Sequence, residues 1–230
     1  IAGPVTHAAI FDGEVYDARI PMGYDTVEKL ATPEVNNEFK GEIVPSAGAE
    51  IYLRHDLTLA PVKAYLWKGV EGAKEKEFGK VIITKEFASG EEMIVKPGET
   101  LVVDFGQNCA GVPSFVFKAT EGTQLSCLPS ELLNDGNGAE SRGMDGPEGS
   151  VHRLNLRIPE TGLLLDYTFG CGNDYVAYHP SHTFYGYRFV SITATDEVSI
   201  QSLTSIPVTS IAKEMEIGTI TTGNELINKM

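Results

Sequence analysis

A polar stretch between two apolar, β-type runs carries the side chains best suited to bind a ligand. It begins at Asp104, continues through Gln107 and Asn108, and includes Gly106 and Gly111. Carboxylate and amide groups can hydrogen-bond a ligand hydroxyl or the backbone of their own turn. The two glycines permit a positive φ or a close backbone approach. We expect a turn joining two strands here, and the sequence leaves open whether it bonds to itself or to a ligand.

Carboxylates near the N-terminus form a second candidate group. Asp12, Glu14 and Asp17 lie close together and are followed by Arg19. Such a group is either an ion-paired turn or a calcium or sugar site built from carboxylates. A glycosidase needs two carboxyl groups at a defined separation. Because the chain has 32 acidic residues, the sequence does not single out a pair, and we assign no catalytic residue.

Two further segments carry potential metal ligands. The Asn134–Asn137 segment has oxygen-bearing side chains beside a glycine, but the acidic residue that would close a calcium loop is out of register, so a plain turn is expected. His179 and His182 flank Pro180, which extends the backbone so that the imidazoles need not converge. We expect ordinary hydrogen-bonding histidines and assign no metal site.

Aromatic residues crowd the span from Tyr175 to Phe189 and alternate around Gly186 near its end. Aromatic faces stack on sugar rings, so the span is a candidate sugar platform. Alternation along a strand also places one set of side chains in a core. We expect these rings to fill a sandwich core, with the exposed platform as the alternative.

The residue pattern predicts many short strands joined by tight turns and shows no sustained helical periodicity. We therefore expect an all-β fold, an antiparallel β-sandwich or jelly roll. Strands are expected at 51–54, 64–68, 81–84, 93–95, 101–103, 113–118, 124–128, 153–158, 163–169, 187–195 and 199–208. Other expected features are a helix or loop at 26–39, a charged tip at 70–79, a turn at 96–99, a surface loop at 134–149 and a helical turn at 225–230 capped by Asn224.

The composition limits the kinds of partner that the chain is expected to bind. The 230 residues suffice for one large domain or two small ones, and the formal charge of −14 argues against nucleic acid and against anionic membranes. No apolar run is long enough to span a membrane. Cys109, Cys127 and Cys171 are odd in number and have no zinc-site spacing, so buried structural thiols are expected, with one disulfide left open.

Four blocks of residues, in this order, resemble the accessory region of bacterial α-L-rhamnosidases, which are inverting glycoside hydrolases. The resemblance covers residues 10–195, and the tail at 218–228 is similar to the lead-in to the family's catalytic barrel. Cys109 departs from it, because an aliphatic residue is more usual there. The blocks are Asp12–Arg19; Asp104–Asn108 with Ala110 and Gly111; Gly122–Thr123 with Ser130–Gly136; and Asp166–Thr168 with His179–Pro180 and Phe184–Val190.

The resemblance implies an N-terminal β module at 1–80, a concanavalin-like or jelly-roll β-sandwich at 81–210, and a lead-in at 211–230 to an (α/α)6 barrel. In the family the catalytic carboxylates lie in that barrel. The resemblance therefore implies a non-catalytic region that supports the barrel of an enzyme removing terminal α-L-rhamnosyl residues. A self-sufficient enzyme is disfavoured because no recognisable catalytic motif is present.

The resemblance also implies an alternative role in carbohydrate binding. Some relatives have an accessory sandwich that binds terminal L-rhamnose with calcium. Calcium is thus the only cofactor left open, and a rhamnose-containing glycan is a candidate partner beside the protein's own catalytic barrel. A bacterial periplasmic or secreted location is favoured over a cytoplasmic one. The candidate carbohydrate-binding residues are Asp104, Gln107, Asn108, Glu131 and Arg188.

Overall fold

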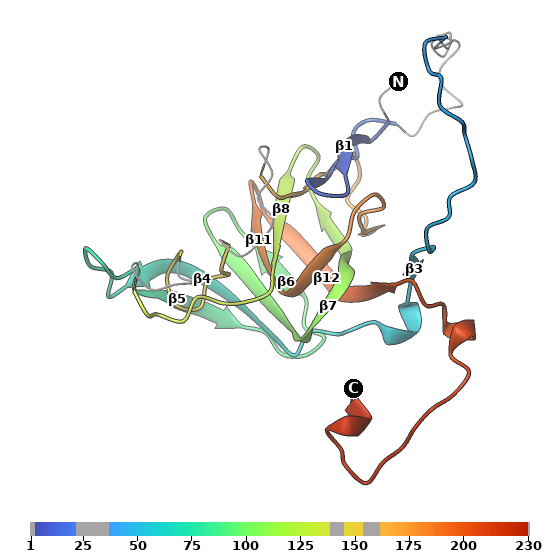
Figure 1. The fold of residues 1–230 in the computed structure, drawn as a ribbon. Coiled ribbons are helices and arrows are strands. Elements are labelled where there is room, and N and C mark those ends of the chain that lie inside the picture. Colours follow the sequence, from blue (N-terminus) through green and yellow to red (C-terminus); the bar gives the residue numbers. More distant parts are fainter. Residues whose placement is uncertain (1–2, 22–36, 139–144, 154–161, 230) are drawn as a thin grey trace.

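The computed structural model describes residues 3–21, 37–138, 145–153 and 162–229. Regular structure in these ranges is almost entirely β-strand, with three short 3-10 turns and no α-helix (Figure 1). The predicted all-β class is therefore confirmed. No helix within the described ranges is long and apolar enough to cross a membrane. Most of the segment predicted as helix or loop at 26–39, and most of the strand predicted at 153–158, lie outside the described residues.

The strands are short except for β7, and most coincide with predicted runs. They are β1 (Val5–Ala9), β2 (Gly13–Asp17), β3 (Tyr52–Leu53), β4 (Lys63–Glu71), β5 (Lys80–Glu86), β6 (Met93–Val95), β7 (Thr100–Ala119), β8 (Gln124–Ser130), β9 (Leu164–Thr168), β10 (Val176–Tyr178), β11 (Tyr185–Ala194) and β12 (Val198–Thr209). The 3-10 turns are η1 (His55–Leu57), η2 (Lys213–Met215) and η3 (Ile227–Lys229).

The strands form two layers that pack face to face, and strand β7 belongs to both of them. Its first half pairs with β4 on one side and β11 on the other. Its second half pairs with β12 and β10. Beyond β11 the hydrogen-bonded order continues through β8, β9, β2 and β1, and β5 extends the sheet beyond β4. Every pair of strands is antiparallel except β2 and β9, so the sheet is mixed but mostly antiparallel.

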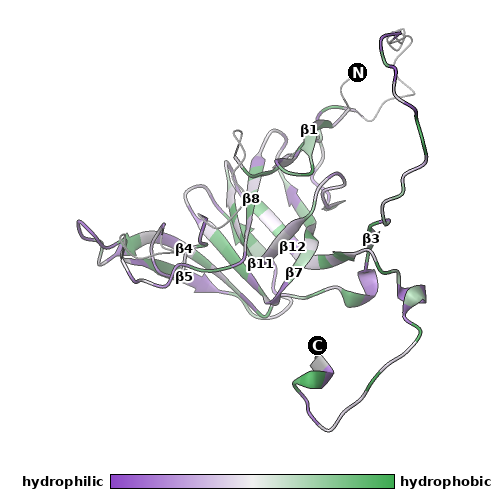
Figure 2. Cartoon of the chain, in the orientation of Figure 1, coloured by the Kyte–Doolittle hydropathy of each residue, from purple (hydrophilic) through white to green (hydrophobic). Residues whose placement is uncertain are grey.

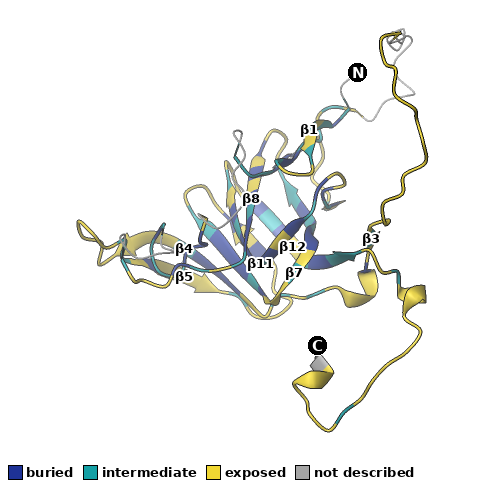
Figure 3. Cartoon of the chain, viewed as in Figure 1, coloured by how far each residue is buried: buried dark blue, intermediate teal, exposed yellow. Residues whose placement is uncertain are grey.

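The hydrophobic core lies between the two layers. Alternate residues of each strand point inward, as a period of two requires. Figure 2 shows hydrophobic residues concentrated on the central strands, and Figure 3 shows the same strands as the most buried part of the chain. Fully buried examples from both layers are Leu101, Val103, Phe117, Ile192, Val198 and Ile200. This alternation also leaves one face of each layer pointing away from the core.

A second, smaller apolar cluster lies on the outer face of the sheet. Tyr65 on β4, Val102 on β7 and Phe189 on β11 pack there with Val81 and Val151. Val151 belongs to the loop after β8, so that loop covers part of the outer face. The rest of this face is lined mainly by polar side chains.

The turn predicted from Asp104 to Gly111 is wrong, because β7 runs through this segment without a break. Its pairing with β11 shifts register between Tyr187 and Phe189, so β7 carries extra residues at this point. Such a β-bulge bends a strand without ending it. Gly106 in the bulge has the predicted positive φ, at +76°. Glycine and short polar residues suit bulges as well as turns, which is why the sequence alone favoured a turn.

Several local predictions are confirmed. The backbone N–H of Glu99 bonds to the carbonyl oxygen of Lys96 at 3.0 Å, which closes the turn predicted at 96–99. Gly111 makes the close approach, since a Cβ there would lie 2.7 Å from a backbone oxygen. Asn224 Oδ1 accepts the backbone N–H of Leu226 at 2.9 Å and so caps the final 3-10 turn.

The predicted division at residue 80 stays a prediction. Strands on its N-terminal side pair with strands on its C-terminal side, namely β2 with β9 and β4 with β7. The sheet is thus continuous across that position. Residues 37–51 and most of 210–229 extend away from the sandwich and are exposed (Figure 3).

Candidate functional site

The structure brings Asp104 and Arg188 into direct contact across β7 and β11. Arg188 Nε and Nη2 donate to the two carboxylate oxygens of Asp104, each at 2.8 Å. Asp104 also accepts the backbone N–H of Gly106 at 2.6 Å. Partial burial opposes ionisation of Asp104, but the bonds from Arg188 and Gly106 outweigh it, and the pKa of Asp104 lies below its ordinary value. Asp104 is therefore an ionised group that fixes the β7 bulge.

The other three predicted residues lie on the same end of the sheet. Asn108 Nδ2 donates to Glu131 Oε1 at 3.3 Å, which links β7 to the residue after β8. Gln107 and Asn108 are exposed, and Glu131 is half-buried. The five residues thus form two bonded pairs and one exposed amide. Asp104 is committed to the bulge and to Arg188, and the role of the five residues in carbohydrate binding stays a prediction.

The N-terminal carboxylates do not converge on one site. Asp17 forms a bidentate ion pair with Arg19, at 2.9 and 2.7 Å, as the ion-paired-turn interpretation predicted. Asp12 lies 3.4 Å from His7 Nε2. Glu14 is 1% exposed, and its hydrogen bonds go to neither Asp12 nor Asp17 nor their partners. A shared calcium or sugar site made of all three side chains is therefore not formed.

Glu14 instead anchors the segment after β10. Its carboxylate accepts the Tyr178 hydroxyl at 2.9 Å and the backbone N–H groups of Ser181 and His182 at 2.8 and 2.9 Å. His179 Nδ1 lies 3.1 Å from the carbonyl oxygen of Pro180. The two histidines thus belong to a segment held by a buried carboxylate, His179 through its ring contact with Pro180 and His182 through its backbone N–H.

Most of the aromatic span is core, as predicted. Tyr178, Tyr185 and Tyr187 lie in the sandwich core, whereas Phe189 is buried in the outer-face cluster, and the Tyr187 hydroxyl donates to Ser205 Oγ at 2.6 Å. A continuous exposed platform of these rings is therefore not formed.

The three cysteines are free thiols. Cys127 is buried and Cys109 is half-buried, and burial raises the pKa of both. Cys171 is exposed, so the prediction of a buried thiol is wrong there. No pairing among the three forms, and the disulfide left open by the sequence is absent.

The segment at Asn134–Asn137 is a hydrogen-bonded turn, as the sequence predicted, and not the calcium loop that was the alternative. Asp135 accepts the backbone N–H of Asn137 at 3.1 Å, whereas Asn134 is buried and donates to Ser150 Oγ at 2.9 Å. The oxygen-bearing side chains therefore point apart. Within the described ranges, no group of three or more His, Cys, Asp or Glu residues is placed to hold a metal ion.

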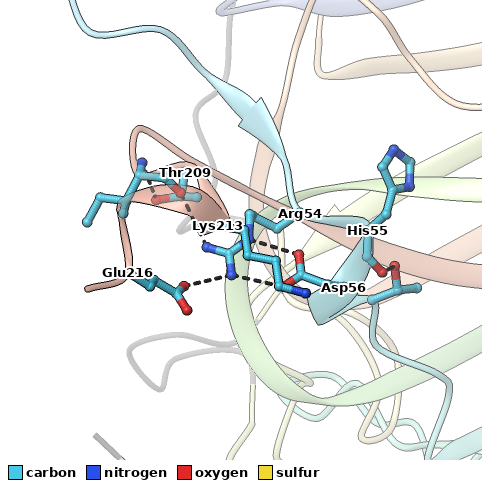
Figure 4. Close-up of polar contacts among 8 residues, drawn as sticks. Arg54, His55, Asp56, Thr209, Lys213 and Glu216 are labelled. Carbon is cyan, nitrogen blue, oxygen red and sulfur yellow. Dashed lines mark hydrogen bonds and ion pairs between the residues drawn. The ribbon is translucent and has the colours of Figure 1, made fainter. Parts of the chain in front are cut away.

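A charged cluster around Arg54 escaped the sequence analysis (Figure 4). Arg54 follows β3 and is 5% exposed. It donates to both carboxylate oxygens of Asp56 at 2.9 and 3.0 Å, to Glu216 at 2.7 Å and to the carbonyl oxygen of Ile211 at 3.3 Å. Lys213 lies 3.9 Å from Asp56. One guanidinium thus ties the segment before β4 to the segment after β12.

The electrostatics of this cluster favour its charged form. The hydrogen bonds from Arg54 lower the pKa of Asp56 to about 2. The hydrogen bond to Asp56, and to a smaller extent the one to Glu216, raises the pKa of Arg54. The close spacing of Arg54 and Asp56 was a local signal of this pair, but nothing local pointed to Glu216.

An apolar groove of about 470 Å³ lies beside the cluster. Its lining includes Ile10, Ile51, Leu53, Phe184 and Val208, together with the segment that Glu14 anchors. Ile10 and Ile51 are each 59% exposed and Leu53 is 36% exposed. Leu53 pairs with Val208 and directly precedes Arg54, so the groove and the charged cluster both lie where β3 meets the end of β12, and we call the two together the end surface.

The fold and these contacts define a class of protein: an all-β, concanavalin-like sandwich whose polar clusters serve mainly to hold strands and segments in place. A family model described as the bacterial alpha-L-rhamnosidase concanavalin-like domain matches residues 94–209, half of the chain. The chain belongs to this family.

Relatives agree with this assignment. The chain is 24% identical over 196 residues to an alpha-L-rhamnosidase from Alteromonas sp. (strain LOR), covering 85% of this chain and 17% of the relative. It is 26% identical over 199 residues to an alpha-L-rhamnosidase from Streptomyces avermitilis, covering 84% and 15%. The chain therefore spans less than a fifth of the length of these curated relatives.

Solved structures share the fold. The Streptomyces avermitilis alpha-L-rhamnosidase complexed with L-rhamnose aligns with a TM-score of 0.58 and 22% identity, over 90% of this chain and 16% of that one. The alpha-L-rhamnosidase from Dictyoglumus thermophilum aligns with a TM-score of 0.54 and 21% identity, over all of this chain and 21% of that one. The similarity thus places the present fold within much larger proteins.

Proposed function

We propose that this chain is the accessory β-sandwich region of an α-L-rhamnosidase, and that its end surface packs against the catalytic part of the same polypeptide. The whole enzyme would remove terminal α-L-rhamnosyl residues from glycans or glycosides. The chain's own contribution would be to support the catalytic barrel and to orient it. No residue of this chain is assigned to the chemical step.

The end surface is the observation that carries the proposal. Exposed apolar patches on a folded protein mark interaction sites, and here the apolar groove adjoins an Arg54 cluster that fixes the outgoing segment. Further apolar side chains on that segment are strongly exposed, with Ile217 at 97%, Ile220 at 87% and Leu226 at 74%. A second domain seated at this end would bury both sets of side chains.

A split-protein experiment tests the proposal. This chain and the catalytic remainder of the polypeptide are expressed separately and mixed, and hydrolysis of an aryl α-L-rhamnoside is followed. We expect the two pieces to co-purify, and the remainder alone to be less soluble or less heat-stable than the mixture. Full stability and activity of the remainder alone, with no association, would refute the proposal.

A further inference from the structure

The outer face of the sheet carries a row of polar side chains that the proposed function leaves unused. Asp166 on β9 is directly opposite Ser126 on β8, and Ser126 is directly opposite Thr193 on β11. On the other side, Thr100 on β7 is directly opposite Trp67 on β4. Opposed residues of neighbouring strands share a face.

The two parts of the row join at β7 and β11. Ile192 on β11 is opposite Leu101 on β7, and the two strands are antiparallel. The residue after Ile192, Thr193, is therefore a neighbour of the residue before Leu101, Thr100. The row therefore crosses five adjacent strands. With strands spaced about 4.8 Å apart, it is about 19 Å long. Ile192 and Leu101 are buried in the core, so the row lies on the opposite face.

A groove of about 470 Å³ runs along this row. All five side chains of the row line it, and Asp145, Val151 and Arg153 of the loop after β8 form a wall. The wall is held in place, because Asp145 accepts the backbone N–H of Arg153 at 2.6 Å and lies 3.3 Å from the buried His152. The volume is within the range of about 300–1,000 Å³ typical of small-molecule sites.

The chemistry of the lining selects a ligand class. The three hydroxyl groups of the row, on Thr100, Ser126 and Thr193, and the Asp166 carboxylate offer hydrogen bonds to a ligand rich in hydroxyls. The Trp67 ring offers an aromatic face for an apolar ring surface. Asp145 and Asp166 outnumber Arg153 in the groove, which disfavours anionic ligands such as phosphates. A pyranose ring, with polar edges and an apolar face, matches this combination.

We propose that this outer-face groove binds a neutral saccharide of one or two rings. Trp67 stacks on a ring at one end of the row, and Thr193, Ser126 and Asp166 bond to ligand hydroxyls further along it. The site is separate from Asp104, Gln107, Asn108, Glu131 and Arg188. It also does not depend on the proposed packing against a catalytic domain, since the chain alone contains every residue of the row.

Trp67 makes the test direct, because it is the only tryptophan in the chain. Its fluorescence reports on the groove without a label. The chain is titrated with L-rhamnose, D-galactose and maltose at millimolar concentrations, with emission and calorimetric heat followed in parallel. We expect at least one sugar to change Trp67 emission with the same Kd that calorimetry gives. Absence of heat with all three, or heat without any change in emission, would overturn the proposal.

Variants locate the site. Trp67→Ala should weaken the binding measured by calorimetry about ten-fold or more, as loss of a central aromatic contact does. Trp67→Phe keeps a ring and should retain more affinity, and Thr193→Val tests the row without touching the ring. The matched control is Tyr175→Ala, which removes a ring that packs on Lys118 away from the groove. Loss of binding in Tyr175→Ala, or unchanged binding in both Trp67→Phe and Thr193→Val, would place the site elsewhere.

Discussion

Glu14 has the chemistry of a ligand-binding carboxylate, but burial turns it into an anchor. A buried carboxylate is tolerated only when its oxygens are hydrogen-bonded. Glu14 meets this condition with one hydroxyl and two backbone N–H groups. Since the segment it holds lines the apolar groove of the end surface, a single side chain on β2 positions one wall of that surface.

Glu14→Gln should lower the free energy of unfolding by about 2–3 kcal/mol, because hydrogen bonds to a charged group are replaced and an amide N–H₂ then faces backbone donors. Urea unfolding measures the change. Asp12→Asn is the control, since the only polar side-chain contact described for Asp12 is a partly exposed one with His7 at 3.4 Å, and its effect should stay below about 1 kcal/mol. Equal effects of the two substitutions would contradict the anchoring role.

The lowered pKa of Asp56 predicts how the stability of the fold depends on pH in acid. Its pKa is lowered to about 2 in the fold, against about 3.9 in an unfolded chain. The folded state thus binds a proton at the Asp56 carboxylate less readily than the unfolded chain does. The stability that ionised Asp56 contributes is therefore complete above about pH 4 and is lost as the pH falls through about 2. Asp56→Asn should reduce the slope of stability against pH between these values. Urea midpoints at neutral pH and at several acid pH values would show it, and identical slopes for the two proteins would contradict it.

At the scale of elements, strand β7 connects the polar row, the Asp104–Arg188 pair and the two layers of the fold. Its first half contributes to the polar row and its bulge holds the Asp104 pair. Its second half passes into the other layer and pairs with β12. The bulge lies between these halves, where a strand shared by two layers has to bend.

Gly106→Ala should therefore destabilise the fold. The left-handed φ of +76° costs a non-glycine residue about 1–2 kcal/mol, and the new Cβ would lie 3.0 Å from a Val62 methyl group. Gly186→Ala on the neighbouring strand is the control, because no positive φ is required there and the nearest atom would be 3.6 Å away. Thermal unfolding compares the two. A loss as large for Gly186→Ala as for Gly106→Ala would argue against strain at the bulge.

The sequence predicted elements better than contacts. Apolar alternation located most strands, and the Lys96–Glu99 turn has a local signature that the structure confirms. Long-range contacts have no such signature: Arg54 meets Glu216 across 162 positions, and the row ending at Trp67 depends on the register of five strands. Periodicity fixes which face a residue occupies, but strand order and register decide its neighbours.

At the scale of the whole molecule, two surfaces divide the remaining roles. The end surface combines an apolar groove with the charged cluster that ties down the outgoing segment, which supports domain packing. The outer-face groove is polar with one tryptophan, which supports saccharide binding. They are built from different residues, so changes in one should leave the other unaffected.

Arg54→Met should release the outgoing segment. Removing the guanidinium leaves Asp56, Glu216 and the Ile211 carbonyl without their shared donor. Limited proteolysis should then cut within residues 211–229 faster than in the unchanged chain, with the sandwich left intact. Arg19→Met is the control, because Arg19 pairs only with nearby Asp17 among the described contacts. Unchanged cleavage in Arg54→Met would show that other contacts hold the segment.

We propose above that the end surface seats the catalytic part of an α-L-rhamnosidase. The most direct measurement is calorimetric titration of the separately expressed catalytic remainder with this chain, comparing Leu53→Asp with Ile94→Asp. Both residues are apolar strand residues of similar exposure, 36% and 39%, but only Leu53 lines the apolar groove. We expect Leu53→Asp to abolish or strongly weaken association and Ile94→Asp to leave it unchanged. Equal association of both variants, or no association of the unchanged chain, would contradict it.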